Sequence, residues 1–401
     1  MTNLNLIFDF QNIAMRALYT CGYGIPTVSS FDTDEECAIL VRKITTDITY
    51  VIRMFSPGRV IIAADARHPW RKDLYTSADE TYKGNRVKDE TKNWDKIFAS
   101  FDELKKIYAD KGFIVSELPH AEADDIASLW KAGLFNESAD KENIMFVTSD
   151  RDWLQLLDFK DDNSLAAAFN PIPGGKGRRI LSVTHACRDW IFSEDEKPDI
   201  FFSNYSPIKE LLKNIQKQDE KITYTAIEPE SIVLEKVMCG DDGDNVPSFY
   251  QYYKNGRKIR ITPLKANKLF EDLNISTIED LCMAESANAL KPALEKLFKK
   301  DIDDIDTAQR LDLQRHLVEL DPLLFPEDIV KSFKYHFKDM MEKPMLSTLN
   351  MTMQDILKDT KYITKDYNKP KKNSVFDGLD IDDIKGLEKF MPDKKNQVSL
   401  F

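Results

Sequence analysis

Short apolar runs that are typical of buried strands recur along the chain, near 4–9, 60–64, 113–116 and 144–148. Longer stretches with the length and spacing of helices separate them, at 33–55, 93–111 and 122–135. Strands that alternate with helices predict a mostly parallel central sheet flanked by helices, which is an α/β fold.

The second half of the chain has a different pattern. Residues 165–169 and 179–183 flank a Gly-rich segment and predict a hairpin. A helix is expected from Glu228 to Met238, and a second one from Thr262 to Leu269, where Thr262 caps and a proline follows. Residues 276–360 have a helical pattern throughout, interrupted by prolines.

Carboxylates follow the apolar runs. Asp9 ends the first run, Asp65 follows the second, and Asp150 follows the fourth, so parallel strands would bring them to one edge of the sheet. We expect a shared site of nine acids: Asp9, Asp65, Glu122, Asp124, Asp125, Asp150, Asp152, Asp241 and Asp244. Like charges this close repel unless cations neutralise them, and all-oxygen ligation favours Mg²⁺ or Mn²⁺, with two ions expected.

The individual acid clusters have alternative interpretations. Glu122 and Asp125 are three residues apart at the start of a helix, so their side chains can point the same way while Asp124 points elsewhere. The alternative to a metal site is a capping box, which would use the same residues for a purely structural purpose. Residues 240–247 lack the alternating oxygen donors of a calcium loop. No Ser-His or Cys-His pairing suggests a nucleophile. Many acids without a nucleophile indicate metal-dependent hydrolysis of phosphodiesters.

The formal net charge is −12, but lysines and arginines are concentrated in two segments that contain no acids. Residues 254–268 contain six Lys and Arg and no acid, and 163–188 also lack acids; solvated loop charge is the alternative interpretation. After Asp65, cations alternate with aromatic residues, a combination that holds single strands and stacks their bases.

The composition indicates in which cellular compartment the protein works. No run of 18 apolar residues occurs, and five cysteines show no Cys-x-x-Cys pairing. We expect a protein with no membrane partner, monomeric, in a reducing cytoplasm, that of a bacterial host if a phage encodes it.

Five motifs resemble, in order, the signatures of the flap endonuclease and 5′-nuclease superfamily. They are Asp65 with Trp70-Arg71-Lys72-Asp73-Leu74-Tyr75 and Tyr82-Lys83-Gly84-Asn85-Arg86, then Glu122-Ala123-Asp124-Asp125, Ser149-Asp150-Arg151-Asp152, and Gly240-Asp241-Asp242-Gly243-Asp244-Asn245-Val246-Pro247. The match covers roughly residues 1–340, and the phage ribonuclease H enzymes are the most similar members.

The resemblance implies a PIN-like core and assigns roles. Eight of the nine acids fall on the family's metal site, with Asp125 as the other acid of its cluster. The residues taken as catalytic are Asp9, Asp65, Lys83 and Arg86. Lys83 and Arg86 fall on a basic arch that contacts the scissile phosphate and steers the 5′ strand. The expected nucleic-acid contacts are Arg71, Tyr82, Lys83, Arg86, Lys254, Arg257, Lys258 and Arg260.

The segment 228–270 resembles a helix-two-turn-helix module that binds duplex backbone. Its usual Gly-rich turn is replaced by Ser248-Phe249-Tyr250-Gln251-Tyr252-Tyr253 and a basic run, which argues against a bound potassium ion. The chain ends Gln397-Val398-Ser399-Leu400-Phe401, which resembles a peptide that docks on a sliding clamp through Gln397, Leu400 and Phe401; a plain tail is the alternative.

The expected organisation is a nuclease core at 1–190 with an arch at about 66–96, an insertion at 191–227, a helical duplex-binding region at 228–365, and a linker with a partner-binding tail at 366–401. The expected activity is a 5′-3′ exonuclease and flap endonuclease that removes RNA primers in DNA replication and acts on flap DNA and RNA–DNA hybrids. The alternatives are a non-catalytic, structure-specific DNA-binding protein, whose mark would be lost acids, and a small metal-dependent ribonuclease without the duplex module.

Overall fold

The computed structural model describes residues 2–21, 30–74, 81–137, 142–159, 165–172, 178–183, 215, 222–302, 306–342, 351–358, 360 and 362. Within them the strands are β1 (Thr2–Asp9), β2 (Pro57–Ala63), β3 (Ile114–Ser116), β4 (Asn143–Val147), β5 (Asp158–Phe159), β6 (Leu165–Asn170), β7 (Arg179–Val183), β8 (Thr223–Ile227), β9 (Gln251–Lys254) and β10 (Arg257–Arg260). The four strands and the hairpin expected from the apolar runs are therefore present.

The helices include the three long ones that were expected. They are α1 (Phe10–Thr20), α2 (Asp34–Phe55), α3 (Trp94–Asp110), α4 (Ala123–Ala132), α7 (Pro229–Cys239), α8 (Pro263–Leu273), α9 (Ile278–Ser286), α10 (Leu290–Phe298), α11 (Thr307–Val318), α12 (Glu327–Met341) and α13 (Met353–Leu357). Short 3₁₀ helices lie at Trp70–Leu74, Asp152–Leu156 and Pro322–Leu324, and a π-helical turn at Gly133–Glu137 follows α4.

The central sheet is mixed but mostly parallel, as predicted. Its strand order in the described residues is β3-β2-β1-β4-β6-β7-β8, with β5 paired to β6. The β6–β7 and β5–β6 pairs are antiparallel, and the other pairs are parallel. Parallel β1, β2 and β4 therefore end at the same edge of the sheet, where α/β proteins place their sites.

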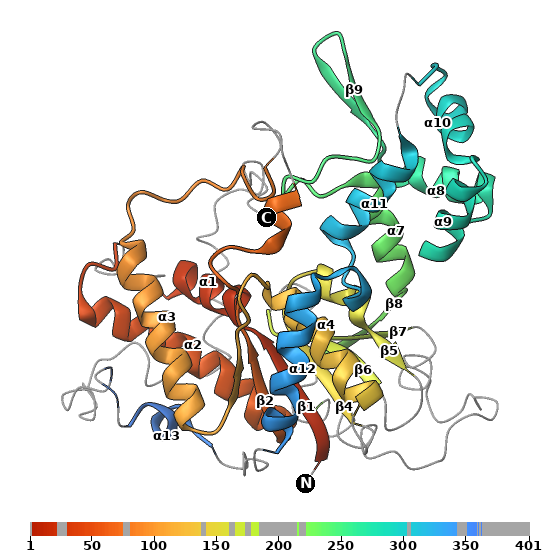
Figure 1. The fold of residues 1–401 in the computed structure, drawn as a ribbon. Coiled ribbons are helices and arrows are strands. Elements are labelled where there is room, and N and C mark those ends of the chain that lie inside the picture. Colours follow the sequence, from red (N-terminus) through yellow and green to blue (C-terminus); the bar gives the residue numbers. More distant parts are fainter. Residues whose placement is uncertain are drawn as a thin grey trace.

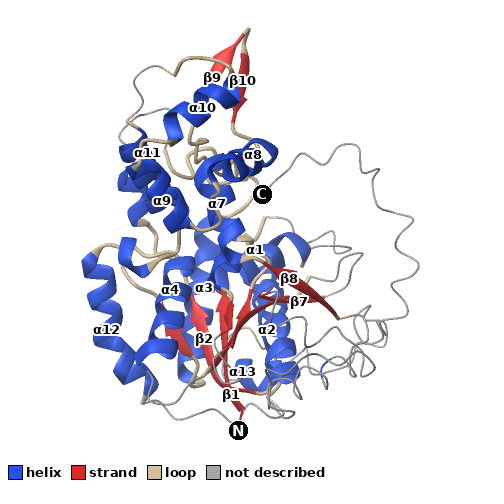
Figure 2. Ribbon diagram, turned by 90° about the vertical axis from the view of Figure 1, so that its right-hand side faces the viewer, coloured by secondary structure: helices blue, strands red, loops and turns tan. Residues whose placement is uncertain are grey.

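Two groups of helices cover the sheet, with α4 and α12 on one side and α2 on the other (Figure 2). A sheet buried on both faces needs strands that are apolar throughout, and β4 is buried at every position. Helix α2 begins with a capping box between Thr33 and Glu36, which satisfies exposed backbone N–H groups at its start. No helix in the described part of the chain has the length and apolarity needed to cross a bilayer.

A second hydrophobic core lies beside the sheet. It is built from α7 to α11 and includes Val237, Phe249, Leu281 and Leu294. These helices form a separate lobe above the sheet, and β9 with β10 projects from it (Figure 1).

The boundaries of the expected regions differ at two places. Strand β8 pairs in parallel with β7, so the end of the expected insertion 191–227 belongs to the core sheet. Helix α12 was expected in the duplex-binding region, but it packs on the core: the Trp130 ring centroid on α4 lies 5.6 Å from that of Phe333 and 5.4 Å from that of Phe337. Most of 191–221 and all of 366–401 lie outside the described residues.

Candidate active site

Asp9 joins the ends of two adjacent strands. It caps α1, with Oδ1 accepting from Asn12 N at 3.1 Å, and Oδ2 accepts from Thr148 Oγ1 at 2.8 Å, just beyond β4. Thr148 Oγ1 also accepts from Asp150 N at 2.9 Å, so Asp9 and Asp150 share one hydroxyl. Burial, together with the charges of Asp150 and Asp65, raises the pKa of Asp9 to about 8.

Asp65 connects β2 with α1 and α4. Its Oδ1 accepts from Ala123 N at 2.7 Å, and its own N–H donates to Gln11 Oε1 at 3.1 Å. Burial raises its pKa to about 6, partly offset by Lys83. The residue after Ala123 is Asp124, so this backbone contact brings a third acid to the same edge.

The cluster at the start of α4 divides as the sequence analysis expected, with Glu122 and Asp125 on one side and Asp124 on the other. Asp124 faces the strand ends: burial and the charge of Asp150 raise its pKa, and its Oδ1 accepts from Trp153 Nε1 at 2.5 Å. Asp125 is fully buried elsewhere, where it pairs with Arg71 at 2.7 Å and accepts from Trp70 Nε1 at 3.0 Å. Glu122 and Asp125 share Arg71, and Glu122 N donates to Asp125 Oδ2 at 3.0 Å as in a capping box, so the cation that Asp125 binds is an arginine.

Asp152 is joined to the second lobe by a lysine. Lys236 on α7 forms ion pairs with Asp152 and, at 2.5 Å, with Asp241. Burial raises the pKa of Asp152 to about 7, with Lys236 opposing and Asp150 adding to the shift. Lys236 was not singled out from the sequence, although a lysine inside the apolar run of α7 is a signal that it has a buried acidic partner.

The loop 240–247 closes on itself. Asp241 and Val246 exchange two backbone hydrogen bonds of 2.9 and 2.7 Å, and Asp241 Oδ1 accepts from Gly243 N at 2.8 Å. Gly240 has φ +72°, and a Cβ there would lie 2.3 Å from Val246 O, so only glycine fits. This tight loop presents Asp244 to Lys83 and Arg86 of the arch.

Basic residues of the arch lie among the acids. Lys83 pairs with Glu122 and, at 3.6 Å, with Asp244, and Arg86 Nη2 lies 2.5 Å from Asp244 Oδ1. Burial would lower the pKa of Lys83, but Glu122 and Asp244 raise it, so this lysine stays charged. Two of the residues expected to contact the scissile phosphate therefore lie beside the acids.

Arg71 and Tyr82 do not fit the expected contacts with nucleic acid. Arg71 is 1% exposed and pairs with Asp125 and Glu122. Tyr82 is 3% exposed, and its hydroxyl donates to Glu122 Oε2 at 2.9 Å and to Asp244 Oδ2 at 3.1 Å. Neither side chain has a free face for a strand or a base, so both hold the acids in place.

The acids at the strand ends have the donor atoms that a divalent cation requires. Their mutual repulsion, which raises the pKa of Asp9, would be relieved by Mg²⁺ or Mn²⁺, which prefer oxygen ligands. Among the described residues no three His, Cys, Asp or Glu side chains are already arranged around one point. The chemistry of the donors therefore fits a divalent ion, with Asp9, Asp65, Asp124 and Asp150 as the residues that would hold it.

The other predicted residues lie farther out. Lys254, Arg257, Lys258 and Arg260 lie on the β9–β10 hairpin, which the sequence analysis did not predict. Its signal is Asn255-Gly256, where both residues have positive φ, as a type I′ turn requires. Gln397, Leu400 and Phe401 lie outside the described residues.

Comparisons with known proteins support the resemblance. Residues 5–170 match the family described as 5′-3′ exonuclease, N-terminal resolvase-like domain. This match supports the similarity of the chain to the 5′-nuclease superfamily. It is 22% identical over 298 residues to a 5′-3′ exonuclease of Mycoplasmopsis pulmonis (strain UAB CTIP), covering 74% of this chain and 81% of the relative. These similarities support a 5′-3′ exonuclease, a hydrolase of nucleic acids.

Solved structures of the superfamily are similar at low identity. A T5 5′-exonuclease with bound zinc is 15% identical, with a TM-score of 0.48, covering 85% of this chain and 99% of the T5 chain. A bacteriophage T5 flap endonuclease in a pseudo-enzyme-product complex with DNA and metal ions is 16% identical, with a TM-score of 0.46, covering 84% and 99%.

Proposed function

We propose that this protein is a Mg²⁺- or Mn²⁺-dependent 5′-3′ exonuclease and flap endonuclease that cleaves branched DNA and RNA–DNA hybrids. The observation that carries the proposal is the meeting of Asp9, Asp65, Asp124 and Asp150 at the ends of β1, β2 and β4, through Thr148 and Ala123. RNA primer removal in DNA replication is the biological role that these substrates suggest.

Different residues of this chain would bind the metal ions, the surrounding water and the phosphate. Asp9, Asp65, Asp124 and Asp150 would hold the ions, while Asp152, Asp241 and Asp244 would hold the surrounding water. When bound, the divalent ions supply the Lewis acidity that activates water and stabilises the leaving oxygen. Lys83 and Arg86 would neutralise the phosphate that enters the site, because both already lie beside Glu122 or Asp244. No residue of the chain needs to form a covalent intermediate.

The decisive experiment uses a 5′-flap duplex labelled at its 5′ end. The wild-type protein should release short labelled products with Mg²⁺ and none after EDTA. Asp150→Asn should abolish cleavage and still bind the flap, because Asp150 is exposed and its loss leaves the core intact. Near-normal turnover by Asp150→Asn would contradict the proposal. A matched RNA–DNA hybrid compares the two substrate classes.

The tail 397–401 extends the proposal to a protein partner. The five residues resemble a clamp-binding peptide, so we propose that Leu400 and Phe401 enter an apolar pocket of a sliding clamp. Removing 397–401 should leave cleavage of a free flap unchanged and remove its stimulation by the clamp of the host. Equal stimulation with and without the tail would contradict this partner.

A further inference from the structure

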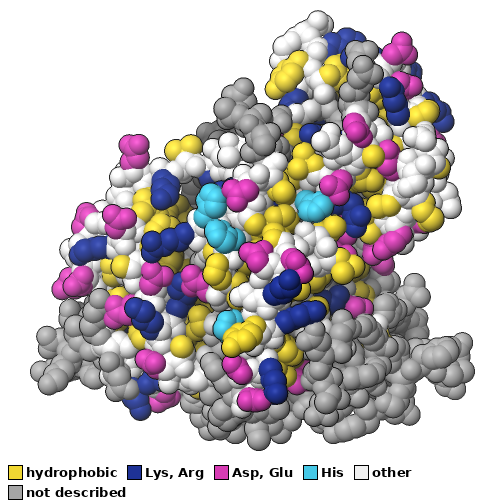
Figure 3. All heavy atoms as spheres, viewed as in Figure 1, with side chains coloured by type: hydrophobic (Ala, Val, Ile, Leu, Met, Phe, Trp, Pro, Cys, Tyr) yellow, Lys and Arg dark blue, Asp and Glu magenta, His cyan; other side chains and the backbone are white. Residues whose placement is uncertain are grey.

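The β9–β10 hairpin is a compact source of positive charge in an acidic protein. Residues 251–260 contain four Lys and Arg and no acid. The hairpin projects from the second lobe, away from the sheet (Figures 1 and 2). Lys and Arg side chains are visible at the end of the molecule from which it projects (Figure 3). An anionic partner therefore has direct access to it.

The cations at the hairpin's outer end are not held in ion pairs within the described part of the chain. Lys254, Arg257 and Lys258 are exposed, and none of them forms an ion pair with another residue in the described part of the chain. By contrast, Lys83 and Arg86 are paired with Glu122 and Asp244. Free cations on a projecting arm attract phosphates at little cost, because no internal ion pair must break.

The register places an aromatic ring beside one of these cations, Lys258, while Lys254 and Arg257 lie on the other face of the hairpin. Tyr253 lies opposite Lys258, and Gln251 lies opposite Arg260, so these four side chains share one face. Tyr253 is 72% exposed, so its ring is accessible to a partner. Cations beside an exposed aromatic ring are the combination that binds unpaired nucleotides.

The opposite face anchors the hairpin to its lobe. Its Tyr252 ring centroid lies 6.0 Å from that of Phe298, and Lys300 Nζ lies 4.8 Å from the Tyr252 ring. The foot of the hairpin is therefore packed, and four residues of strand at about 3.4 Å each carry the tip roughly 14 Å outward.

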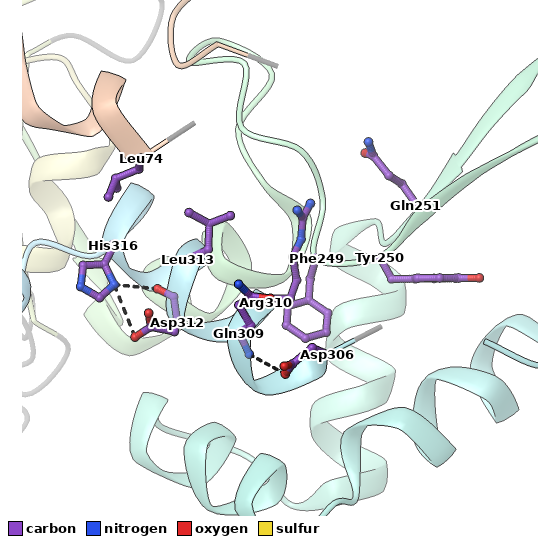
Figure 4. A pocket seen from close by; sticks show the side chains of 10 residues that line it. All are labelled: Leu74, Phe249, Tyr250, Gln251, Asp306, Gln309, Arg310, Asp312, Leu313 and His316. Atoms are coloured by element: carbon purple, nitrogen blue, oxygen red, sulfur yellow. Dashed lines mark hydrogen bonds and ion pairs between the residues drawn. The ribbon is translucent and has the colours of Figure 1, made fainter. Parts of the chain in front are cut away.

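The face of the hairpin that carries Tyr253 extends toward the loop 240–247 of the candidate active site. Arg260 pairs with Asp242, in the same loop as Asp241 and Asp244. Gln251 also lines a groove of about 830 Å³, whose other walls come from Leu74, at the start of the arch, and from Arg310 and His316 on α11 (Figure 4). A strand held by the hairpin thus has room to continue toward the arch.

We propose that the β9–β10 hairpin is an arm that binds unpaired nucleotides beside the duplex, with Tyr253 stacking on a base and Lys254, Arg257 and Lys258 binding phosphates. The inference rests on the proposed function for its substrate class. It gives the protein a preference for branched over continuous duplex that does not depend on the catalytic acids.

The test measures binding in EDTA, where no cleavage occurs. Fluorescence anisotropy compares a labelled 5′-flap duplex with a blunt duplex of the same sequence for the wild-type protein, Tyr253→Ala, and the triple variant Lys254→Ala, Arg257→Ala, Lys258→Ala. Matched controls lie on α12: Tyr335→Ala, whose ring is 77% exposed, and the triple variant Lys331→Ala, Lys334→Ala, Lys338→Ala.

Tyr253→Ala should raise the Kd for the flap about 5- to 150-fold, the range of one lost base stack, and change the Kd for the blunt duplex by less than about twofold. The triple variant should lower the slope of log K against log salt by about 2 to 2.7. The control variants should leave both quantities unchanged.

Unchanged flap binding by Tyr253→Ala would overturn the inference, even if the triple variant binds weakly. Equal loss in the hairpin and α12 variants would also overturn it. These outcomes are independent of the nuclease proposal, which is tested by cleavage of the flap with Mg²⁺ by the wild-type protein and by Asp150→Asn.

Discussion

Lys236 on α7 forms an ion pair with Asp152, which follows β4, and this pair joins the second lobe to the acids of the core. Lys236→Ala would leave Asp152 and Asp241 without their common cation. We expect the free energy of unfolding in EDTA to fall by about 1 to 3 kcal/mol, between the costs of breaking an exposed and a fully buried pair, because Lys236 and Asp152 are 12% and 17% exposed. Urea denaturation measures it.

The matched control for this variant is Arg151→Ala. Arg151 pairs with Glu235, which lies next to Lys236 on α7, but the Arg151 side chain is 56% exposed. Loss of this pair should therefore lower the free energy of unfolding by less than about 1 kcal/mol. A Lys236→Ala protein as stable as Arg151→Ala would mean that the buried pair contributes no more than a surface pair.

Arg71 is expected to act on stability and not on binding. Its side chain is 1% exposed and paired with Asp125, so Arg71→Ala should lower the free energy of unfolding by about 3 to 5 kcal/mol. The folded fraction should bind a flap duplex with the wild-type Kd in EDTA. A variant of normal stability with weakened binding would restore the original interpretation of Arg71 as a nucleic-acid contact.

Tyr82→Phe separates a hydrogen-bonding role from a stacking role. The change removes only the hydroxyl that donates to Glu122 and Asp244, so it should cost about 1.5 to 3 kcal/mol of stability and slow single-turnover cleavage. If Tyr82 stacked on a base, the phenyl ring would preserve activity. Tyr253→Phe, the control on the hairpin, should bind flaps normally because its ring is retained.

The stability of the metal-free protein should depend on pH through Asp9. Its pKa of about 8 in the folded state lies above the usual 3.8, so the folded state binds the proton more tightly than the unfolded state. The Asp9 contribution to stability is therefore present below pH 3.8 and is progressively lost as the pH rises toward 8. Urea denaturation in EDTA at pH 5, 6.5 and 8 should show this decline, and Asp9→Asn should flatten it. An identical decline in the variant would assign it to other acids.

The sequence was enough to locate the acids because their placement is local. Asp9, Asp65 and Asp150 each follow an apolar run, and parallel strands necessarily bring such positions to one edge. The burial of Arg71 and Tyr82 could not be predicted, since it depends on acids that are 40 or more residues away along the chain. The same applies to α12, whose return to the core rests on Trp130 packing with Phe333 and Phe337.

The hairpin shows a different limit of sequence reasoning. Asn255-Gly256 is a strong local turn signal, but the flanking strands are too polar to alternate clearly between apolar and polar residues. Such strands are recognised from their pairing, which appears only when the chain is folded.

The acids come from two separately packed cores, since Asp241 and Asp244 follow α7 of the second lobe while the others lie at the sheet. Thermodynamic linkage then makes lobe docking and substrate engagement one equilibrium: a duplex that spans both lobes stabilises the docked arrangement, and the docked arrangement tightens its hold on the duplex. Loosening this junction would move Asp241 and Asp244 away from the acids of the sheet while both cores remain folded, so activity could be lost without any loss of folded protein.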